Sequence, residues 1–142
     1  MSGITYLSRE DGDMVATMLD WADGNNLPEL TLHQSCIGDD RPPIWEGFPK
    51  DKETLLKLDH LILVEQNLYD IPNEIACMVN LKEIYLIDNS IFDIPNELLE
   101  LPNLEHLDLS ENYDLELTEY QIKKIEELQD KGCQILYEEY EE

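Results

Sequence analysis

Two consecutive blocks of 23 residues in the middle of the chain repeat one pattern. The first block runs from Leu58 to Asn80 and the second from Leu81 to Asn103, and they align without a gap. Apolar residues recur at block positions 1, 4, 6, 11, 14, 18 and 21, and Ile-Pro stands at positions 14 and 15 of each block. Self-similarity at such a period is typical of a chain that stacks similar units, each of which buries its apolar side against its neighbours.

A third, partial block continues the pattern from Leu104 to Asn112. Asn stands at block position 9 in the last two blocks (Asn89 and Asn112), whereas the first block has Gln66. Together the blocks resemble the leucine-rich repeat family, in the bacterial 23-residue variety that has Ile-Pro on the convex side. The resemblance implies an α/β fold, a short solenoid with a parallel sheet on its concave face. It also implies that Asn at position 9 bonds the backbone of neighbouring turns, which Gln66 would do less neatly.

Residues 1–57 are expected to form an N-terminal cap, because an open end of the stack would expose apolar surface. Apolar spacing predicts a helix that ends near Ala22, and a second helical segment is expected at Lys52–Lys57. Leu27–Ser35 matches block positions 1, 4, 6 and 9, which we interpret as a degenerate first repeat. The conformation of the loop over 38–52 stays open.

Residues 113–142 are expected to form the C-terminal cap. Thr118 and Gln121 have the spacing of a capping box, which predicts the start of a helix. Cys133–Tyr137 is then expected to be a last parallel strand. The chain of 142 residues is therefore predicted to be one α/β domain, with regular repeats over 58–112 between the two caps.

The charge of the chain is strongly one-sided, with 33 acidic residues, nine basic residues and a formal net charge of −24. Such a surface repels nucleic acid and anionic membranes and attracts cationic partners. Between Leu58 and Ile122 the sequence has 15 acids and a single basic residue, Lys82. The charge therefore predicts a basic protein partner, although charge of this size also serves solubility.

The targeting and cysteine patterns indicate a cytoplasmic protein. The N-terminal sequence lacks the basic and apolar regions of a signal peptide. No apolar run approaches the ~20 residues that a membrane span requires. The three cysteines (Cys36, Cys77 and Cys133) are far apart, and we interpret them as reduced thiols, mostly in the core.

The residues between the inward-facing leucines form the candidate binding site. Strand residues alternate faces, so block positions 3, 5 and 7 are predicted to point outward on the concave side, with position 8 at its edge. This places an apolar patch on two adjacent strands inside an acidic rim, with two histidines beside it, which is typical of a protein-binding surface. Alternatively, β-branched and aromatic residues merely suit strands. The predicted partner-binding residues are Ile62, Val64, Tyr85 and Ile87 in the patch, Glu65, Asp88, Asp108 and Glu111 in the rim, and the histidines His60 and His106.

The sequence gives little support to catalysis or metal binding. His60 and His106 fall in one column but two turns apart, roughly 9–10 Å at the ~4.8 Å spacing of strands, which is too far to share one ion. The third histidine, His33, falls in the degenerate first repeat. No glycine-rich phosphate loop and no supported nucleophile–base pair is present. We therefore expect no cofactor, no metal site and no enzymatic activity.

Two functions remain open at this level. The first is a non-catalytic module, monomeric when free, that binds a basic protein through an acidic concave face. Its concrete form is an inhibitor or immunity protein that neutralises a cationic toxin such as a nuclease. The alternative is a generic bacterial leucine-rich repeat scaffold or effector-type binding protein whose charge serves solubility.

Overall fold

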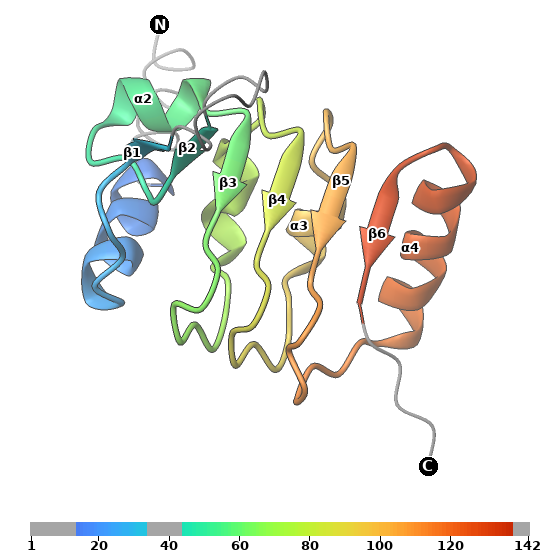
Figure 1. Ribbon diagram of the computed structural model, residues 1–142. Coiled ribbons are helices and arrows are strands. Elements are labelled where there is room, and N and C mark those ends of the chain that lie inside the picture. Colours follow the sequence, from blue (N-terminus) through green and yellow to red (C-terminus); the bar gives the residue numbers. More distant parts are fainter. Residues whose placement is uncertain (1–13, 34–43, 138–142) are drawn as a thin grey trace, which may run out of the picture.

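The computed structural model describes residues 14–33 and 44–137 and shows a mixed helix and strand fold around one parallel sheet (Figure 1). The sheet has four strands in the order β3-β4-β5-β6. These strands are β3 (His60–Ile62), β4 (Glu83–Tyr85), β5 (His106–Asp108) and β6 (Gln134–Leu136). The first three are offset by 23 residues, since His60 pairs with Glu83 and Glu83 with His106. The predicted α/β class and the predicted position of these strands are confirmed.

The apolar positions of the two full blocks supply the core. All fourteen of these side chains are buried, and most of them are fully covered. They are Leu58, Leu61, Leu63, Leu68, Ile71, Ile75, Met78, Leu81, Ile84, Leu86, Ile91, Ile94, Leu98 and Leu101. The period of the repeat therefore determines both the register of the strands and the contents of the core.

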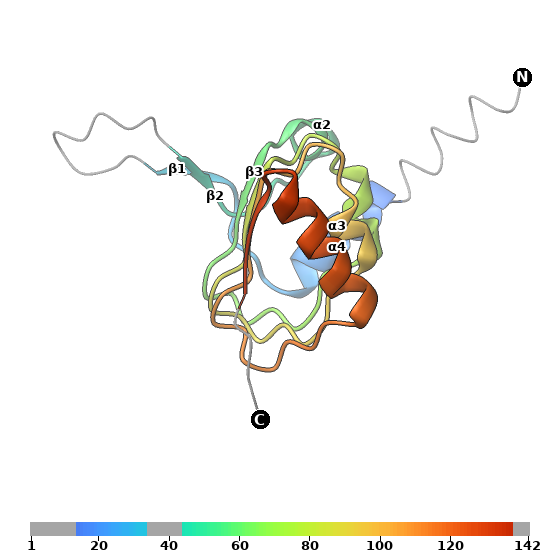
Figure 2. The ribbon, with the colours of Figure 1, turned by 90° about the vertical axis from the view of Figure 1, so that its right-hand side faces the viewer.

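The Ile-Pro pairs start short helical segments behind the sheet. Pro72 is the N-cap of the 3₁₀ helix η1 (Asn73–Cys77), and Pro95 is the N-cap of α3 (Asn96–Leu99). Both prolines have extended backbone angles, and a proline lacks the N–H group that would have no helical partner here. These segments, together with α4, cover one face of the sheet and leave the other face open (Figure 2).

The buried amide of Asn89 joins two neighbouring turns of the chain. Its Oδ1 accepts hydrogen bonds from the backbone N–H groups of Gln66 at 2.8 Å and Leu68 at 3.2 Å. Its Nδ2 donates to the carbonyl groups of Leu63 at 2.9 Å and Leu86 at 3.0 Å. One side chain thus satisfies backbone groups that the strands leave without partners at the bend.

Other asparagines make similar contacts at both ends of the strands. Asn112 accepts from the N–H of Ile91 at 3.1 Å, one turn further along the chain. At the opposite bend, the residues that close the blocks, Asn80 and Asn103, each donate to a carbonyl group of the preceding turn. Gln66 has no such role, because its Nε2 donates to Val64 of its own turn at 3.0 Å.

The predicted N-terminal helix and the predicted segment at Lys52–Lys57 are both confirmed. The first helix covers 14–24 and buries Val15, Met18 and Ala22 against the end of the core. The second is α2 (Lys52–Lys57), which is capped by Asp51 and buries Leu55 completely. Both helices therefore close the β3 end of the stack.

The described part of Leu27–Ser35, which we interpreted as a degenerate first repeat, joins a different sheet from the regular repeats. β1 (Thr31–His33) pairs antiparallel with β2 (Ile44–Glu46) in a separate two-stranded sheet. Figure 2 shows these strands projecting on the open side of the main sheet. Only ten residues separate them, 34–43, and a parallel pair needs a longer crossover. Residues 34–43, which include Ser35 and Cys36, lie outside the described residues.

Gly47 joins the two sheets at a point where no side chain fits. Its N–H donates to the carbonyl of Ile62 at 3.3 Å, and its φ is +102°. A Cβ atom built on this glycine would collide with the carbonyl oxygen of Glu29 and lie 2.8 Å from that of Pro28. The base of the β1–β2 hairpin therefore depends on glycine at this position.

The C-terminal cap follows the prediction. The capping box is present, because the N–H of Gln121 donates to Thr118 Oγ1 at 3.1 Å and the N–H of Thr118 donates to Gln121 Oε1 at 3.0 Å. The helix α4 (Glu119–Asp130) then leads to β6, which pairs parallel with β5. Gln129 donates to the carbonyl of Ile135 at 3.1 Å, so α4 occupies part of the outer edge of the sheet.

None of the helices in the described ranges has the length and apolar character that crossing a membrane requires.

We predict that Asn89→Ala lowers the free energy of unfolding by about 3 kcal/mol, because it leaves several buried backbone groups without partners. Gln66→Ala is the matched control, since Gln66 occupies the same block position one turn earlier and its side chain bonds Val64 of its own turn. It should cost less than about 1 kcal/mol. Urea denaturation followed by circular dichroism measures both, and equal losses would show that the amide of Asn89 has no special role.

We also predict that Gly47→Ala lowers the free energy of unfolding by about 2 kcal/mol or more, because alanine is strained at this φ and meets two carbonyl groups. Gly24→Ala is the control, since a Cβ atom at Gly24 meets nothing within 4 Å. Thermal unfolding compares the two variants. A Gly47→Ala protein as stable as the Gly24→Ala protein would contradict the assigned backbone geometry.

Candidate functional site

The open face of the sheet, which is the side away from α3 and α4, holds all ten predicted partner-binding residues. The register sets Ile62, Tyr85 and Asp108 side by side on β3, β4 and β5. His60 and His106 flank Glu83 in a second row. The remaining predicted residues follow the strands by two or three positions, where the ladder of parallel hydrogen bonds continues from β3 to β5. The structure therefore brings the predicted residues together.

Two predictions about exposure need correction. Of the apolar patch only Val64 is well exposed, at 36%, while Ile62, Tyr85 and Ile87 are half-buried. The patch therefore exposes less apolar surface than expected, because neighbouring residues cover part of these side chains. Asp108 was predicted in the exposed rim, yet it is only 9% exposed. His33 is not on this face, since β1 belongs to the other sheet.

Leu136 extends the row of Ile62, Tyr85 and Asp108 onto the last strand. It pairs with Asp108 in the register of β5 and β6 and is 41% exposed. The four strands therefore present one continuous row with apolar side chains at both ends and a carboxylate between Tyr85 and Leu136.

A chain of polar contacts crosses the second row. His60 lies between two carboxylates, with Nδ1 at 3.0 Å from Asp59 Oδ1 and Nε2 at 3.0 Å from Glu83 Oε2. The hydroxyl of Tyr85 donates to Glu83 Oε1 at 2.7 Å. The ring of Tyr85 lies against the ring of His106, with centroids 4.8 Å apart. These contacts fix the orientation of the aromatic and carboxylate groups before any partner arrives.

These contacts shift the pKa values of Glu83 and Tyr85. The hydrogen bond from Tyr85, followed by the charges of His60 and His106, lowers the pKa of Glu83. Partial burial, followed by the bond to Glu83 and the charges of Glu83 and Asp108, raises the pKa of Tyr85 to about 12. The hydroxyl of Tyr85 therefore keeps its proton at neutral pH and remains a hydrogen-bond donor to Glu83.

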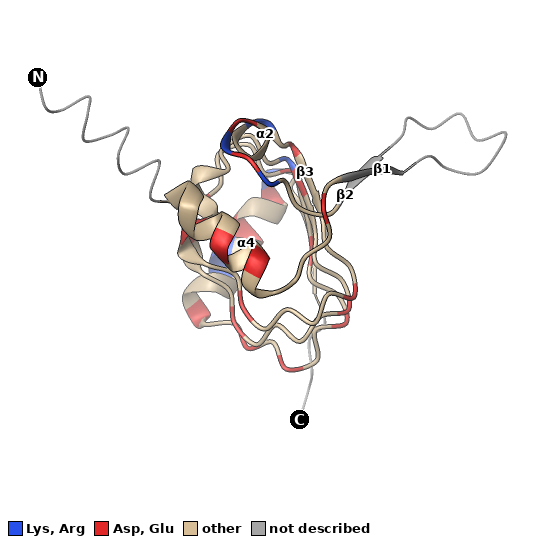
Figure 3. Ribbon diagram, turned by 90° about the vertical axis from the view of Figure 1, so that its left-hand side faces the viewer, with Lys and Arg blue, Asp and Glu red and all other residues tan. Residues whose placement is uncertain are grey.

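Three acids form an edge along the open face, and all three have left-handed backbone conformations. Glu65, Asp88 and Glu111 occupy the same position in successive turns, with φ of 57°, 58° and 62°. Their side chains are exposed. Figure 3 shows the acidic positions that successive turns align at one edge of the molecule. We call these three residues the acidic edge.

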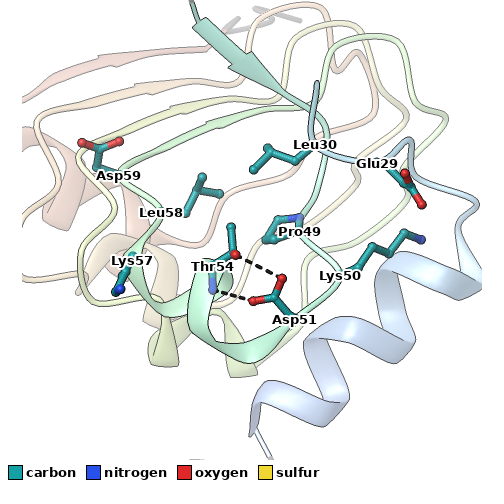
Figure 4. A pocket seen from close by; sticks show the side chains of 9 residues that line it. All are labelled: Glu29, Leu30, Pro49, Lys50, Asp51, Thr54, Lys57, Leu58 and Asp59. Carbon is teal, nitrogen blue, oxygen red and sulfur yellow. Dashed lines mark hydrogen bonds between the residues drawn. The ribbon is translucent and has the colours of Figure 1, made fainter. Parts of the chain in front are cut away.

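A hollow of about 700 Å³ lies at the N-terminal cap, and none of the predicted site residues lines it (Figure 4). It combines apolar residues with charges of both signs. Its two lysines are already paired, Lys50 with Asp23 at 3.4 Å and Lys57 with Glu53 at 3.0 Å. The lining residues are Glu29, Leu30, Pro49, Lys50, Asp51, Thr54, Lys57, Leu58 and Asp59. The repeat pattern does not predict this hollow, because most of its lining lies outside the regular repeats, in α2 and the segments before it.

The remaining chemistry of the described residues is sparse. No group of three His, Cys, Asp or Glu side chains in the described ranges is placed to hold a metal ion. Cys77 and Cys133 are buried, as expected for core cysteines. Burial, followed by the charge of Glu105, raises the pKa of Cys133, which keeps this thiol protonated and unreactive.

Comparison with known proteins gives no family for this chain. No protein-family model matches the sequence, and a search of curated proteins also finds no match. The function must therefore be inferred from the open face itself, from its acidic edge and from the contacts that orient Glu83, Tyr85 and the two histidines.

We predict that the stability of the protein depends on Glu83 below neutral pH. Because folding lowers the pKa of Glu83 from 4.5, its contribution is present above pH 4.5 and is lost as the pH falls through the lowered value. Glu83→Gln should therefore flatten the decline of stability between about pH 5 and pH 3. Urea denaturation at several pH values measures this slope.

Tyr85→Phe is the matched variant, because it keeps the ring and removes the largest cause of the shift in the pKa of Glu83. It should raise that pKa toward its ordinary value and reproduce most of the flattening. An NMR titration of the Glu83 carboxyl group reads the pKa directly. An unchanged titration in Tyr85→Phe would show that the hydrogen bond does not exist in solution.

Proposed function

We propose that the chain is a short leucine-rich repeat solenoid that binds a basic protein through its open face. The 23-residue offset of the strands, the buried repeat positions and the asparagine contacts support the repeat assignment. The acidic edge is the observation that carries the proposed function. It lines the open face with three exposed negative charges that are held by the fold itself.

The backbone geometry of the acidic edge supports a role for its charge in binding. A left-handed conformation suits glycine and is tolerated by asparagine or aspartate, but it costs other residues about 1–2 kcal/mol. Glu65 and Glu111 nevertheless occupy such positions, with Asp88 between them. Acids placed elsewhere on the surface would keep the protein equally soluble without this strain. Placement here instead creates a negative field over the row of Ile62, Tyr85 and Asp108, and such a field steers a cationic partner.

The concrete form of the proposal is an inhibitor or immunity protein that acts in the cytoplasm and is monomeric when free. Its target would be a cationic toxin, and a nuclease is the class that best fits an acidic face. Enzymes that bind polyanions present basic sites, and an acidic protein can cover such a site in place of the nucleic acid. The protein itself would act without catalysis, by occupying the target.

We predict that the double variant Asp88→Lys/Glu111→Lys slows association with the basic partner by about tenfold or more at low salt. The partner would be isolated by affinity capture from the native host at about 50 mM salt, where exposed charges are weakly screened. Association rates by stopped flow or surface plasmon resonance test the prediction. The effect should shrink at about 300 mM salt, because screening shortens the range of the field.

The double variant Asp70→Lys/Asp93→Lys is the matched control. Asp70 and Asp93 are also exposed acids at one position of successive turns, but they precede the Ile-Pro segments behind the sheet. Each double variant replaces two negative charges by two positive ones, so the net charge changes equally. Equal slowing by both variants would favour the alternative, a scaffold whose charge serves solubility. If the captured partner is a nuclease, its activity should fall on addition of the wild-type protein and recover with the Asp88→Lys/Glu111→Lys variant.

A further inference from the structure

Asp108 is a buried carboxylate on a face that is otherwise half-open. It is 9% exposed, whereas the equivalent residues Ile62 and Tyr85 on the neighbouring strands are half-buried. One of its oxygens, Oδ1, accepts a hydrogen bond from the N–H of Ser110 at 3.0 Å. Its other oxygen forms no hydrogen bond or ion pair within the described residues. A carboxylate that is largely buried and has no partner of opposite sign is less well solvated than one at the surface, so this position calls for an explanation.

The described residues supply no cation for Asp108. Lys82 is the only basic residue between Leu58 and Ile122, and its charge acts on Asp59. The histidine of the same strand, His106, directs Nδ1 to Gln134 at 3.1 Å. Within the described ranges, therefore, the negative charge of Asp108 is left uncompensated by the protein.

Glu83, on the same face, is a carboxylate whose charge is compensated by neighbouring side chains. One of its oxygens receives the hydroxyl of Tyr85 at 2.7 Å, and the other lies 3.0 Å from Nε2 of His60. Both oxygens of Glu83 are thus occupied by side chains of the protein. Asp108 differs because, within the described residues, the only hydrogen bond to its carboxylate comes from the backbone of its own turn.

The surroundings of Asp108 suit the aliphatic stem and the charged head of a basic side chain. Tyr85 and Leu136 flank it in the register of the sheet, and they provide apolar surface on both sides. The acidic edge lies beyond the C-terminal ends of the same strands. A long basic side chain could therefore place its stem against Leu136 or Tyr85 and its head on Asp108.

We propose that Asp108 is the anchor of the binding face and receives the cationic head of an arginine or lysine side chain of the partner. The inference rests on the proposed function, since it names the chemical group through which the basic partner is recognised. Contact with the partner removes the remaining water from Asp108, and the ion pair then forms in a medium of low dielectric constant. The acidic edge raises the rate of encounter, whereas Asp108 slows dissociation.

The test uses short peptides as probes: hexa-arginine, hexa-lysine and the neutral hexa-citrulline, which resembles hexa-arginine in shape. Binding to the full-length chain is measured by isothermal titration calorimetry at about 50 mM salt. The variants are Asp108→Asn, Asp88→Asn in the acidic edge, and Asp70→Asn behind the sheet. Each removes one negative charge, and Asp108→Asn keeps an oxygen that can accept the bond from Ser110. Thermal unfolding of each free variant is the second measurement.

We expect wild-type protein to bind hexa-arginine or hexa-lysine and to ignore hexa-citrulline. Asp108→Asn should weaken binding of the charged peptide at least about tenfold, and Asp88→Asn by about threefold or less. Asp108→Asn should also raise the melting temperature by about 2–4 °C, because it removes an uncompensated buried charge. Loss of affinity together with a gain of stability is the combination that a merely structural residue would not give.

Other outcomes separate the two levels of the hypothesis. If a charged peptide binds but Asp108→Asn and Asp88→Asn weaken it equally, the anchor is wrong and the acidic face stands. A lower melting temperature for Asp108→Asn would likewise overturn the anchor, since the carboxylate would then serve the fold. If no charged peptide binds, or if Asp70→Asn weakens binding as much as Asp88→Asn does, the proposed function itself fails.

Discussion

The buried amides of Asn89 and Asn112 close the bend that follows each strand, and the stacking of the turns depends on them. A residue of positive φ, such as Asp88, follows three positions after the end of a three-residue strand, and the backbone groups beyond it cannot join the sheet. Asn89 accepts two N–H groups from the preceding turn and donates to carbonyl groups of both turns. Leucines alone would bury the same area without fixing this geometry, because apolar contacts are non-directional. The amides convert an apolar stack into one with a defined register.

This dependence explains how much of the fold the sequence could predict. Where Asn recurs at block position 9 together with the leucines, the strands and their register follow directly from the spacing. The last strand lies 28 residues after β5, so the repeat does not predict it, but the capping box and the apolar run after α4 do. Leu27–Ser35 matches four positions of the repeat, yet the strand in this segment joins the other sheet. Its position 9 is Ser35, which has no amide, and a strand close enough to form a hairpin follows at Ile44–Glu46.

The candidate site was predictable only as far as backbone periodicity reaches. Alternation along a strand told which residues face outward, and this placed His60, Tyr85 and His106 correctly. It could not tell that Asp108 would be buried, because that depends on the side chains of its neighbours on other strands. It also could not predict the bond from Tyr85 to Glu83, which requires a particular side-chain rotamer. The sequence pattern therefore predicts which residues belong to the site, whereas their burial and hydrogen bonds depend on packing.

Two unfavourable features of the structure lie on the open side of the sheet. Behind the sheet, prolines begin the helical segments, and Gln121 bonds the carbonyl of Ile94 at 2.8 Å, so the backbone there is well satisfied. The open side combines the strained backbone of the acidic edge with the uncompensated charge of Asp108. A cationic partner would relieve the electrostatic part of this cost, because it neutralises Asp108 and weakens repulsion among the edge acids. Binding and folding stability are then linked: the free protein is less stable than its core alone would allow, and the complex recovers the difference. Substitutions that stabilise the free chain at these positions should for the same reason weaken its complex.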